Sequence, residues 1–198
     1  MRKLIIDTPV VDPIQRIVAA VCDVLAEEGV TQLSLRKVAA KAGATLGLIT
    51  HHFPNRAAMV KAAVAETWKR ENQVVQWAEV PDKAAVMGAI EVFLPYDEER
   101  RRQTAVWVAF WALAHQSRDL QKIHQDVHRF IREKHTVWIS ALGFSPDRAE
   151  LLADRLKLFI DGLLLYAYLD PEHWTPERIR RSVDDMIDSI FAQAPDAP

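Results

Sequence analysis

Residues 35–53 read Leu35-Arg-Lys-Val38-Ala39-Ala-Lys-Ala42-Gly43-Ala-Thr45-Leu-Gly47-Leu-Ile49-Thr-His-His-Phe53, and this pattern predicts two short helices joined by a tight turn. Gly43 supplies the left-handed backbone of the turn, and Thr45 caps the second helix. The small side chains of Ala39 and Ala42 allow the two helices to cross closely. Such a pair is a helix-turn-helix, whose second helix enters the major groove of DNA.

The remainder of the chain also predicts helices. Only six glycines and few alternating β-branched runs argue against a sheet. We place the other helices at 13–28, from Asn55 to about Trp77, and at 82–94, 97–115, 119–141, 147–169 and 176–192. The expected fold is all-α, with about nine helices. We divide it into a helix-turn-helix DNA-binding domain over residues 1–60 and a helical ligand-sensing and dimerisation domain over 61–198.

Composition narrows the class of protein. The chain has 198 residues, 49% of them hydrophobic, and Cys22 is its single cysteine, which excludes a disulfide scaffold within the chain. Its first residues contain too short an apolar run for a signal peptide. The most apolar stretch is interrupted by Lys157 and Asp161 and is shorter than the ~20 residues of a membrane-spanning helix. These features predict a cytoplasmic protein, and no motif predicts a cofactor or a metal.

The net charge of −2 is unevenly distributed. Residues 29–65 contain no Asp or Glu, whereas five basic residues give this window +5 and leave the rest of the chain with −7. The basic residues are Arg36, Lys37, Lys41, Arg56 and Lys61. Positive charge gathered on a small helical unit is typical of phosphate binding, and a solvated basic face is the alternative.

Residues 13 to about 60 resemble the TetR (tetracycline-repressor-like) family of transcriptional regulators. The resemblance combines the turn, the short helix after it, Phe53 and the Asn55-Arg56 helix start. The sequences Trp107-Val-Ala-Phe-Trp111 and Ile160-Asp-Gly-Leu163 are similar to those of the choline- and betaine-related repressors. Many family members carry Tyr where this chain has Thr50, but a small hydroxyl residue is usual in the choline-type subgroup. The resemblance implies a dimer that binds palindromic DNA.

The helix-turn-helix supplies the candidate DNA contacts. We expect the start of its second helix, at Thr45, to hold a phosphate, and apolar side chains on that helix to meet thymine methyl groups. Arg36 stands where the family's repressors reach a guanine edge; a phosphate contact or a solvated arginine is the alternative. The predicted contacts are Arg36, Thr45, Leu46, Leu48, Thr50, His51, His52 and Arg56.

Large rings concentrate in the C-terminal part of the chain. Aromatic rings on one helix face attract a quaternary ammonium ion by cation–π interaction, and a plain hydrophobic core is the alternative. Asp161, charged within an apolar helix, is a ligand partner, a core acceptor or an interface group. The predicted ligand-binding residues are Trp107, Phe110, Trp111, His115, Trp138 and Asp161. His124 and His128, four residues apart, suit a surface metal site less well than a solvated or pocket-lining helix face.

The last two predicted helices are the candidate dimer interface. The helix at 147–169 is apolar on more than one face, and Gly162 permits close approach of another helix. The helix at 176–192 carries one apolar stripe, from Ile179 to Phe191. Two copies of each would form a four-helix bundle, and ordinary core within one chain is the alternative.

The sequence therefore predicts a DNA-binding regulator, most simply a homodimeric repressor released from a palindromic operator by a small molecule. Two alternatives stay open. One is a helical small-molecule-binding protein or enzyme without DNA binding, although no catalytic triad or phosphate loop stands out. The other is a DNA-binding protein that senses no ligand.

Overall fold

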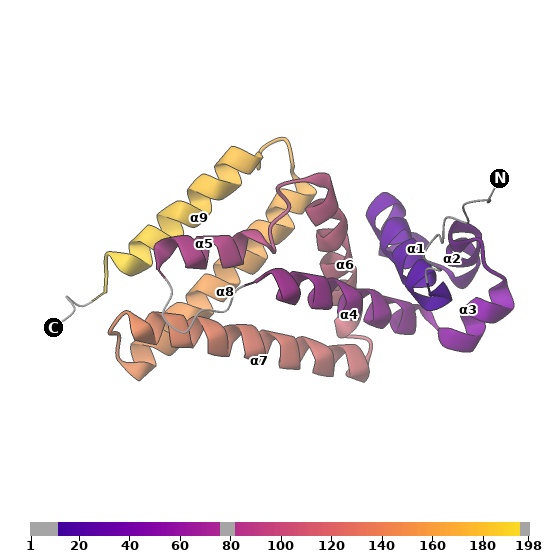
Figure 1. Cartoon of the computed structure of the whole chain (residues 1–198), viewed down its shortest axis with the longest axis horizontal. Helices are drawn as coiled ribbons and strands as arrows, with labels where there is room; N and C mark the ends of the chain where they lie inside the picture. The colour runs from indigo at the N-terminus through magenta and orange to yellow at the C-terminus, as the bar shows by residue number, and fades with distance from the viewer. Residues whose placement is uncertain (1–11, 76–81, 195–198) are drawn as a thin grey trace, which may run out of the picture.

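The computed structural model describes residues 12–75 and 82–194, which form nine α-helices, one short 3-10 helix and no strand (Figure 1). The all-α prediction is confirmed. The helices are α1 (Pro13–Glu28), the 3-10 helix η1 (Val30–Gln32), α2 (Leu35–Ala42), α3 (Leu46–His52), α4 (Arg56–Val74), α5 (Lys83–Glu91), α6 (Glu98–Ala114), α7 (Arg118–Ala141), α8 (Pro146–Leu169) and α9 (Pro176–Phe191). No helix of the described ranges is long and apolar enough to cross a membrane.

Side-chain caps fix where the N-terminal helices begin. The Ser34 hydroxyl accepts from the Lys37 amide at 3.3 Å, and the Asn55 carboxamide accepts from the Ala58 amide at 2.9 Å. Gly43 has φ of 58°, the left-handed conformation that ends α2. These starts and stops match the predicted ones. The fourth helix ends at Val74, and Val75, which was expected to be helical, is its extended C-cap; residues 76–77 of the predicted last turn lie outside the described residues.

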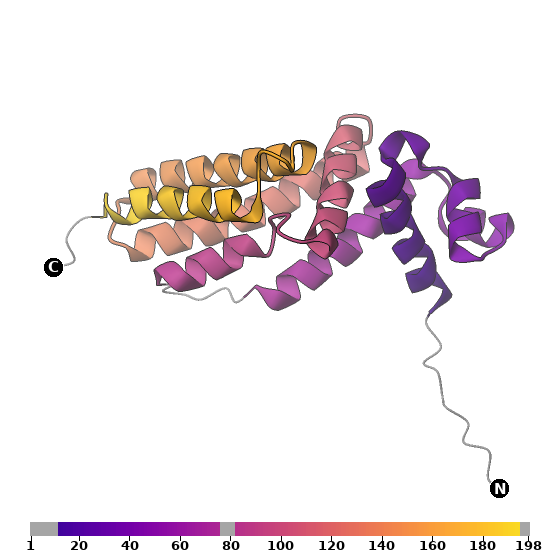
Figure 2. The ribbon, with the colours of Figure 1, turned by 90° about the horizontal axis from the view of Figure 1, so that it is seen from above.

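Two hydrophobic cores share the helix α6. The first core joins α1, α2, α3 and α4 with Val106, Phe110 and Leu120, and the second joins α5, α7, α8 and α9, with Trp111 of α6 packed against it. Figures 1 and 2 show the resulting elongated molecule, with α1, α2 and α3 at one end, α4 and α6 in the middle, and α5, α7, α8 and α9 at the other. The predicted domain boundary at residue 60 therefore falls inside α4, which contributes to the N-terminal core and packs on α6.

The last two helices use their apolar residues differently. The α9 stripe of Ile179, Val183, Ile187 and Ile190 is buried within the chain, as part of the second core. The alternative, core within one chain, therefore describes these four residues, and the dimer through the last two helices stays a prediction. On α8, in contrast, large apolar side chains remain exposed beside the buried ones: Leu151, Leu158, Tyr166 and Leu169.

Candidate functional site

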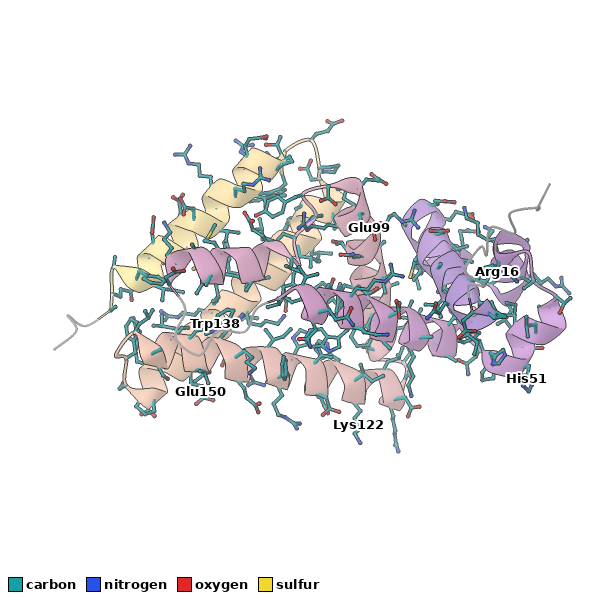
Figure 3. All side chains as sticks on the ribbon, viewed as in Figure 1. Arg16, His51, Glu99, Lys122, Trp138 and Glu150 are labelled. Atoms are coloured by element: carbon teal, nitrogen blue, oxygen red, sulfur yellow. The ribbon has the colours of Figure 1, made fainter. Side chains whose placement is uncertain are left out.

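The first candidate site is the outer surface of the helix-turn-helix. The helix α3 lies at one extremity of the molecule, and Figure 3 shows His51 at its outer side. His51 and His52 are exposed with their rings 4.9 Å apart, and Leu46 is 41% exposed. Ile49, on the opposite face of α3, is fully buried in the N-terminal core. The helix α3 thus packs one face against the rest of the head, the unit formed by α1, α2 and α3, and exposes its other face to solvent.

Two predicted contacts on α3 interact with other residues of the chain. The Thr50 hydroxyl donates to the carbonyl of Gly47 at 3.1 Å, so its hydrogen is used within the helix. Leu48 is half-buried and packs against the N-terminal core. Thr45 caps α3 by accepting from the Leu48 amide at 3.2 Å, which leaves its hydroxyl hydrogen available to a phosphate oxygen. Leu46 is therefore the apolar side chain of α3 that projects outward.

The basic window, residues 29–65, is partly neutralised in the folded chain by acidic side chains from outside it. Lys41 pairs with Glu27 at 2.6 Å, and Lys37 pairs with Glu28, both acids from the end of α1. The sequence did not predict these pairs because Glu27 and Glu28 lie just before the acid-free residues 29–65. The turn after α1 brings them next to the lysines of α2 only in the folded chain. Arg36 and Arg56 are exposed and form no ion pair with any described residue. The fifth basic residue, Lys61, lies 3.8 Å from Asp119, so among the five these two arginines carry charge without an ion-pair partner in the described ranges.

The second candidate site is a cavity of about 40 Å³ between α5, α6, α7 and α8. Trp107, Trp111, Trp138 and Asp161, four of the predicted ligand-binding residues, line it. Figure 3 shows Trp138 inside the C-terminal bundle. Most of the lining is apolar, and its titratable side chains are His128, His135, Lys157 and Asp161. The full lining is Ala89, Ile90, Phe93, Trp107, Trp111, Val127, His128, Ile131, His135, Trp138, Lys157, Ile160, Asp161 and Leu164.

Two predicted ligand contacts lie elsewhere. Phe110 is fully buried in the N-terminal core, with its ring 5.8 Å from that of Trp107, so it stands behind the cavity wall. His115 is exposed at the C-terminal end of α6 and is absent from the lining. The aromatic pattern identified the right helix but not which turn and face of it meet the cavity.

An ion pair supplies the charge of the cavity lining. The Lys157 ammonium contacts the carboxylate of Asp161 one turn along α8, and the side chain of Lys157 is 12% exposed. Burial lowers the pKa of Lys157 and raises that of Asp161, while their mutual attraction opposes both shifts. Sequence reasoning noted Lys157 only as an interruption of an apolar run. Its spacing of four residues from Asp161 was the available signal.

Neutral histidines surround this pair. Burial, assisted by the charge of Lys157, lowers the pKa of His128 and of His135 to about 3, so both are uncharged near neutral pH. The Nδ1 atom of His128 lies 3.8 Å from Asp161 Oδ2, and its ring centroid is 3.9 Å from that of His124. Within the described ranges, no group of three or more His, Cys, Asp or Glu side chains is arranged to hold a metal ion.

One residue of the cavity lining, Trp107, forms a hydrogen bond with α4, the helix that follows the helix-turn-helix. The indole Nε1 of Trp107 donates to the carboxyl of Glu71 on α4, at 3.0 Å from Oε1 and 3.1 Å from Oε2. Glu71 is 2% exposed, and burial raises its pKa to about 8, although the hydrogen bond from Trp107 opposes the shift. Sequence reasoning missed Glu71. It continues the buried face of Val60, Val64 and Thr67 at helical spacing, which was the signal available.

Two family models match the chain. Residues 17–63 match bacterial regulatory proteins of the tetR family, and residues 82–192 match the C-terminal domain of the BetI-type transcriptional repressor. Among curated relatives, the HTH-type transcriptional regulator PksA of Bacillus subtilis (strain 168) is 27% identical over 185 residues, which cover 90% of each chain. The HTH-type transcriptional regulator BetI of Proteus mirabilis (strain HI4320) is 25% identical and covers 88% of this chain and 89% of its own.

Solved structures share the whole architecture. A transcriptional regulator from Rhodococcus sp. Rha1 has a TM-score of 0.84 and 31% identity, covering 95% of this chain and 100% of its own. A regulator from Saccharomonospora viridis, solved in complex with choline, has a TM-score of 0.73, 19% identity, and coverage of 88% of this chain and 94% of its own. At that identity the second similarity concerns the fold alone.

Proposed function

The chain belongs to the TetR family of transcriptional repressors, with a BetI-type C-terminal domain, and on that premise we propose that it is a homodimer which a small organic cation releases from its operator. Proteins of this family are regulators of transcription rather than enzymes, so the enzyme alternative is set aside. They bind operator DNA as dimers and respond to small effectors. We assign the surfaces of this chain that bind DNA, form the dimer and bind the effector.

The operator contacts are assigned to the outer face of α2 and α3. Arg36 and Arg56 supply unpaired charge to the DNA, and Thr45 offers a hydroxyl at the N-terminal end of α3. Leu46 projects toward thymine methyl groups, while His51 and His52 approach the backbone. Thr50 and Leu48 have secondary roles, since the first donates within α3 and the second packs on the core.

The dimer interface is assigned to the exposed stripe of α8, accompanied by the outer face of α9. Leu151, Leu158, Tyr166 and Leu169 follow one another at intervals of seven, eight and three residues, which places them along one side of the helix. A contiguous exposed apolar stripe of this length supports association with a second copy. A two-fold axis through it pairs α8 with its counterpart.

The effector is assigned to the cavity between α5, α6, α7 and α8. The observation that carries this assignment is the convergence of Trp107, Trp111 and Trp138 with the charged residue Asp161 in the lining of one cavity. Indole faces attract quaternary ammonium groups, each by roughly 0.5–2 kcal/mol. The choline complex of the Saccharomonospora viridis regulator, which has the same fold, supports an organic cation of this class.

The DNA assignment is tested by fluorescence anisotropy with a labelled duplex carrying the palindrome upstream of the chain's own gene. Arg56→Ala and Thr45→Ala should each weaken operator binding by about tenfold, because each removes a phosphate contact. Lys122→Met, which alters an exposed lysine on α7, is the control and should leave the affinity unchanged. Unchanged affinity in both head variants would contradict the assignment. An operator-binding chain that no ammonium compound stabilises against heat would instead be a regulator without this effector.

A further inference from the structure

Three consecutive arginines near the start of α6, Arg100, Arg101 and Arg102, each contact a different part of the molecule. Successive residues of a helix point about 100° apart, so the three side chains leave α6 in different directions. The Arg100 guanidinium pairs at 2.7 Å with Asp97, the residue that caps α6 itself. Arg101 and Arg102 reach other helices, and neither has a role in the proposed function.

Arg101 joins α6 to the last turn of α8. Its guanidinium donates to the main-chain carbonyls of Ala167 and Tyr168, at 3.2 Å and 3.1 Å, and its carbon Cζ lies 5.3 Å from the centre of the Tyr168 ring. The last carbonyls of a helix have no partner within the helix and carry partial negative charge, so a cation stabilises them. Tyr166 and Leu169, at the same end of α8, belong to the exposed stripe assigned to the dimer interface. Arg101 therefore fixes the start of α6 relative to that interface.

Arg102 joins the same part of α6 to the head. Its guanidinium forms an ion pair with Asp23 of α1, and both side chains are half-buried. Beside this pair lies a cavity of about 90 Å³ between α1, α4 and α6, whose lining includes Cys22 and Arg102. The residues of α6 that belong to the N-terminal core begin only at Val106 and continue to Phe110. The ion pair is thus a polar link between α1 and the start of α6, at a place where a cavity interrupts the packing.

We propose that Arg101 and Arg102 are positioning residues that set the orientation of the two heads in the dimer, and with it the half-site spacing of the operator that the protein accepts. Arg101 holds α6 to the dimer helix α8, and Arg102 holds the head to α6. One series of contacts therefore runs from the two-fold axis to the DNA. This inference rests on the proposed function, because it concerns the dimer and the operator assigned there.

Loss of either link leaves the chain folded but frees the head to tilt. Without the ion pair, α1 pivots about the core at Val106 and Phe110, and the cavity beside Arg102 gives it room to move. A half-buried ion pair contributes little to the free energy of unfolding, so its removal changes the position of the head more than the stability. The half-sites of a palindrome lie at a fixed separation, and the two heads bind together only when their spacing fits it. The two arginines therefore determine which spacing is accepted rather than how a single half-site is bound.

The test is fluorescence anisotropy of the full chain with the upstream palindrome and with two duplexes whose half-sites are moved two base pairs apart or together. The unmodified chain should bind the natural spacing at least about tenfold more tightly than either altered one, because only one head then reaches its half-site. In Arg101→Met and in Arg102→Met this ratio should fall below about threefold, since a head that tilts reaches both half-sites at several spacings. Arg100→Met, which removes the same charge from the same turn but leaves both links intact, is the matched control and should keep the full ratio.

A charge swap guards against misfolding of these variants. Arg102→Asp and Asp23→Arg each place like charges together and should lose the spacing preference, whereas the two changes combined restore an ion pair and should recover it. An unchanged ratio in Arg101→Met or Arg102→Met, or a combined variant that does not recover the preference, would overturn the inference and leave the proposed function intact. So would an unmodified chain that binds all three duplexes equally well. An unmodified chain that binds none of the duplexes would overturn the proposed function together with the inference.

Discussion

The indole Nε1 of Trp107 and the buried carboxyl of Glu71 form a hydrogen bond of 3.0 Å that joins the wall of the cavity between α5, α6, α7 and α8 to the helix α4. Trp107 lines the cavity from α6, and Glu71 lies on α4, the helix that begins directly after the helix-turn-helix. A second link, between Arg102 of α6 and Asp23 of α1, ties the same helix to the head. The helix α6 therefore contacts both functional regions.

Replacement of Trp107 by Phe should uncouple the two sites. The ring still fills the cavity wall, but the donor to Glu71 is lost, so movement of α6 reaches α4 less directly. We expect the effector-induced loss of operator affinity to shrink from about tenfold or more to less than about threefold. The free energy of unfolding should fall by ~1–3 kcal/mol, because a buried carboxyl is left without its donor.

Paired operator and effector titrations measure this coupling. Trp174→Phe, at a half-buried tryptophan that precedes α9 and lies outside the cavity lining, is the matched control. Full effector response in Trp107→Phe would show that the hydrogen bond does not transmit the signal.

Glu71 should make the protein less stable as the pH rises. Its pKa is raised from 4.5 to about 8, so between those values the folded chain holds a proton that the unfolded chain has released. The stability due to this proton is complete below the lower value and is lost as the pH rises through the upper one. Glu71→Gln keeps an acceptor for Trp107 but does not titrate, so it should equal the unmodified chain near about pH 5 and exceed it by a few kcal/mol at about pH 9.

Urea denaturation at several pH values checks this, with Glu150→Gln as the control at an exposed α8 position. A stability difference that stays constant over the whole range would mean that Glu71 ionises normally.

The sequence predicted the helices well because their ends are encoded locally. Ser34, Thr45 and Asn55 cap the helices they were expected to cap, and Gly43 forms the expected turn. What could not be predicted depends on contacts between distant segments. The pairs of Lys37 and Lys41 with acids of α1 exist only once the head has folded.

The cavity illustrates the same limit. Helical spacing placed Trp107 and Trp111 on one face, but it did not reveal that Phe110 turns into the N-terminal core. His115 lies one residue past the end of α6, too far along to reach the cavity. For α9, the apolar stripe was read correctly as buried, yet periodicity cannot tell which partner covers a buried face.

The ion pairs of the head should be visible in the salt dependence of operator binding. Arg36→Ala and Arg56→Ala should each reduce the slope of log affinity against log salt by about one unit, because each arginine displaces a counterion from the DNA. Lys41→Ala should reduce it by less than about half of that, because Glu27 already neutralises this lysine. Equal slopes for the lysine and arginine variants would contradict the claim that Arg36 and Arg56 contact the DNA while the charge of Lys41 is neutralised by Glu27.

A charge in the exposed stripe of α8 should prevent dimerisation. Leu158 is 72% exposed in the single chain. In Leu158→Glu, a two-fold dimer through this stripe would bury two negatively charged glutamates in one interface, which is unfavourable. Sedimentation velocity should report a monomer for this variant and a dimer for Val74→Glu, an exposed apolar position at the end of α4. Operator affinity should drop by more than about tenfold along with the dimer. A Leu158→Glu protein that sediments as a dimer would place the interface elsewhere.

The central claim is that occupation of the cavity between α5, α6, α7 and α8 releases the helix-turn-helix from DNA. The most direct measurement is the dissociation constant of the full chain for its upstream palindrome, with and without saturating choline, by fluorescence anisotropy. We predict that the ligand raises this constant by about tenfold or more, within the range of allosteric coupling energies. A ligand that binds in the cavity, as shown by loss of binding in Asp161→Asn, yet leaves the operator dissociation constant unchanged, would contradict the account.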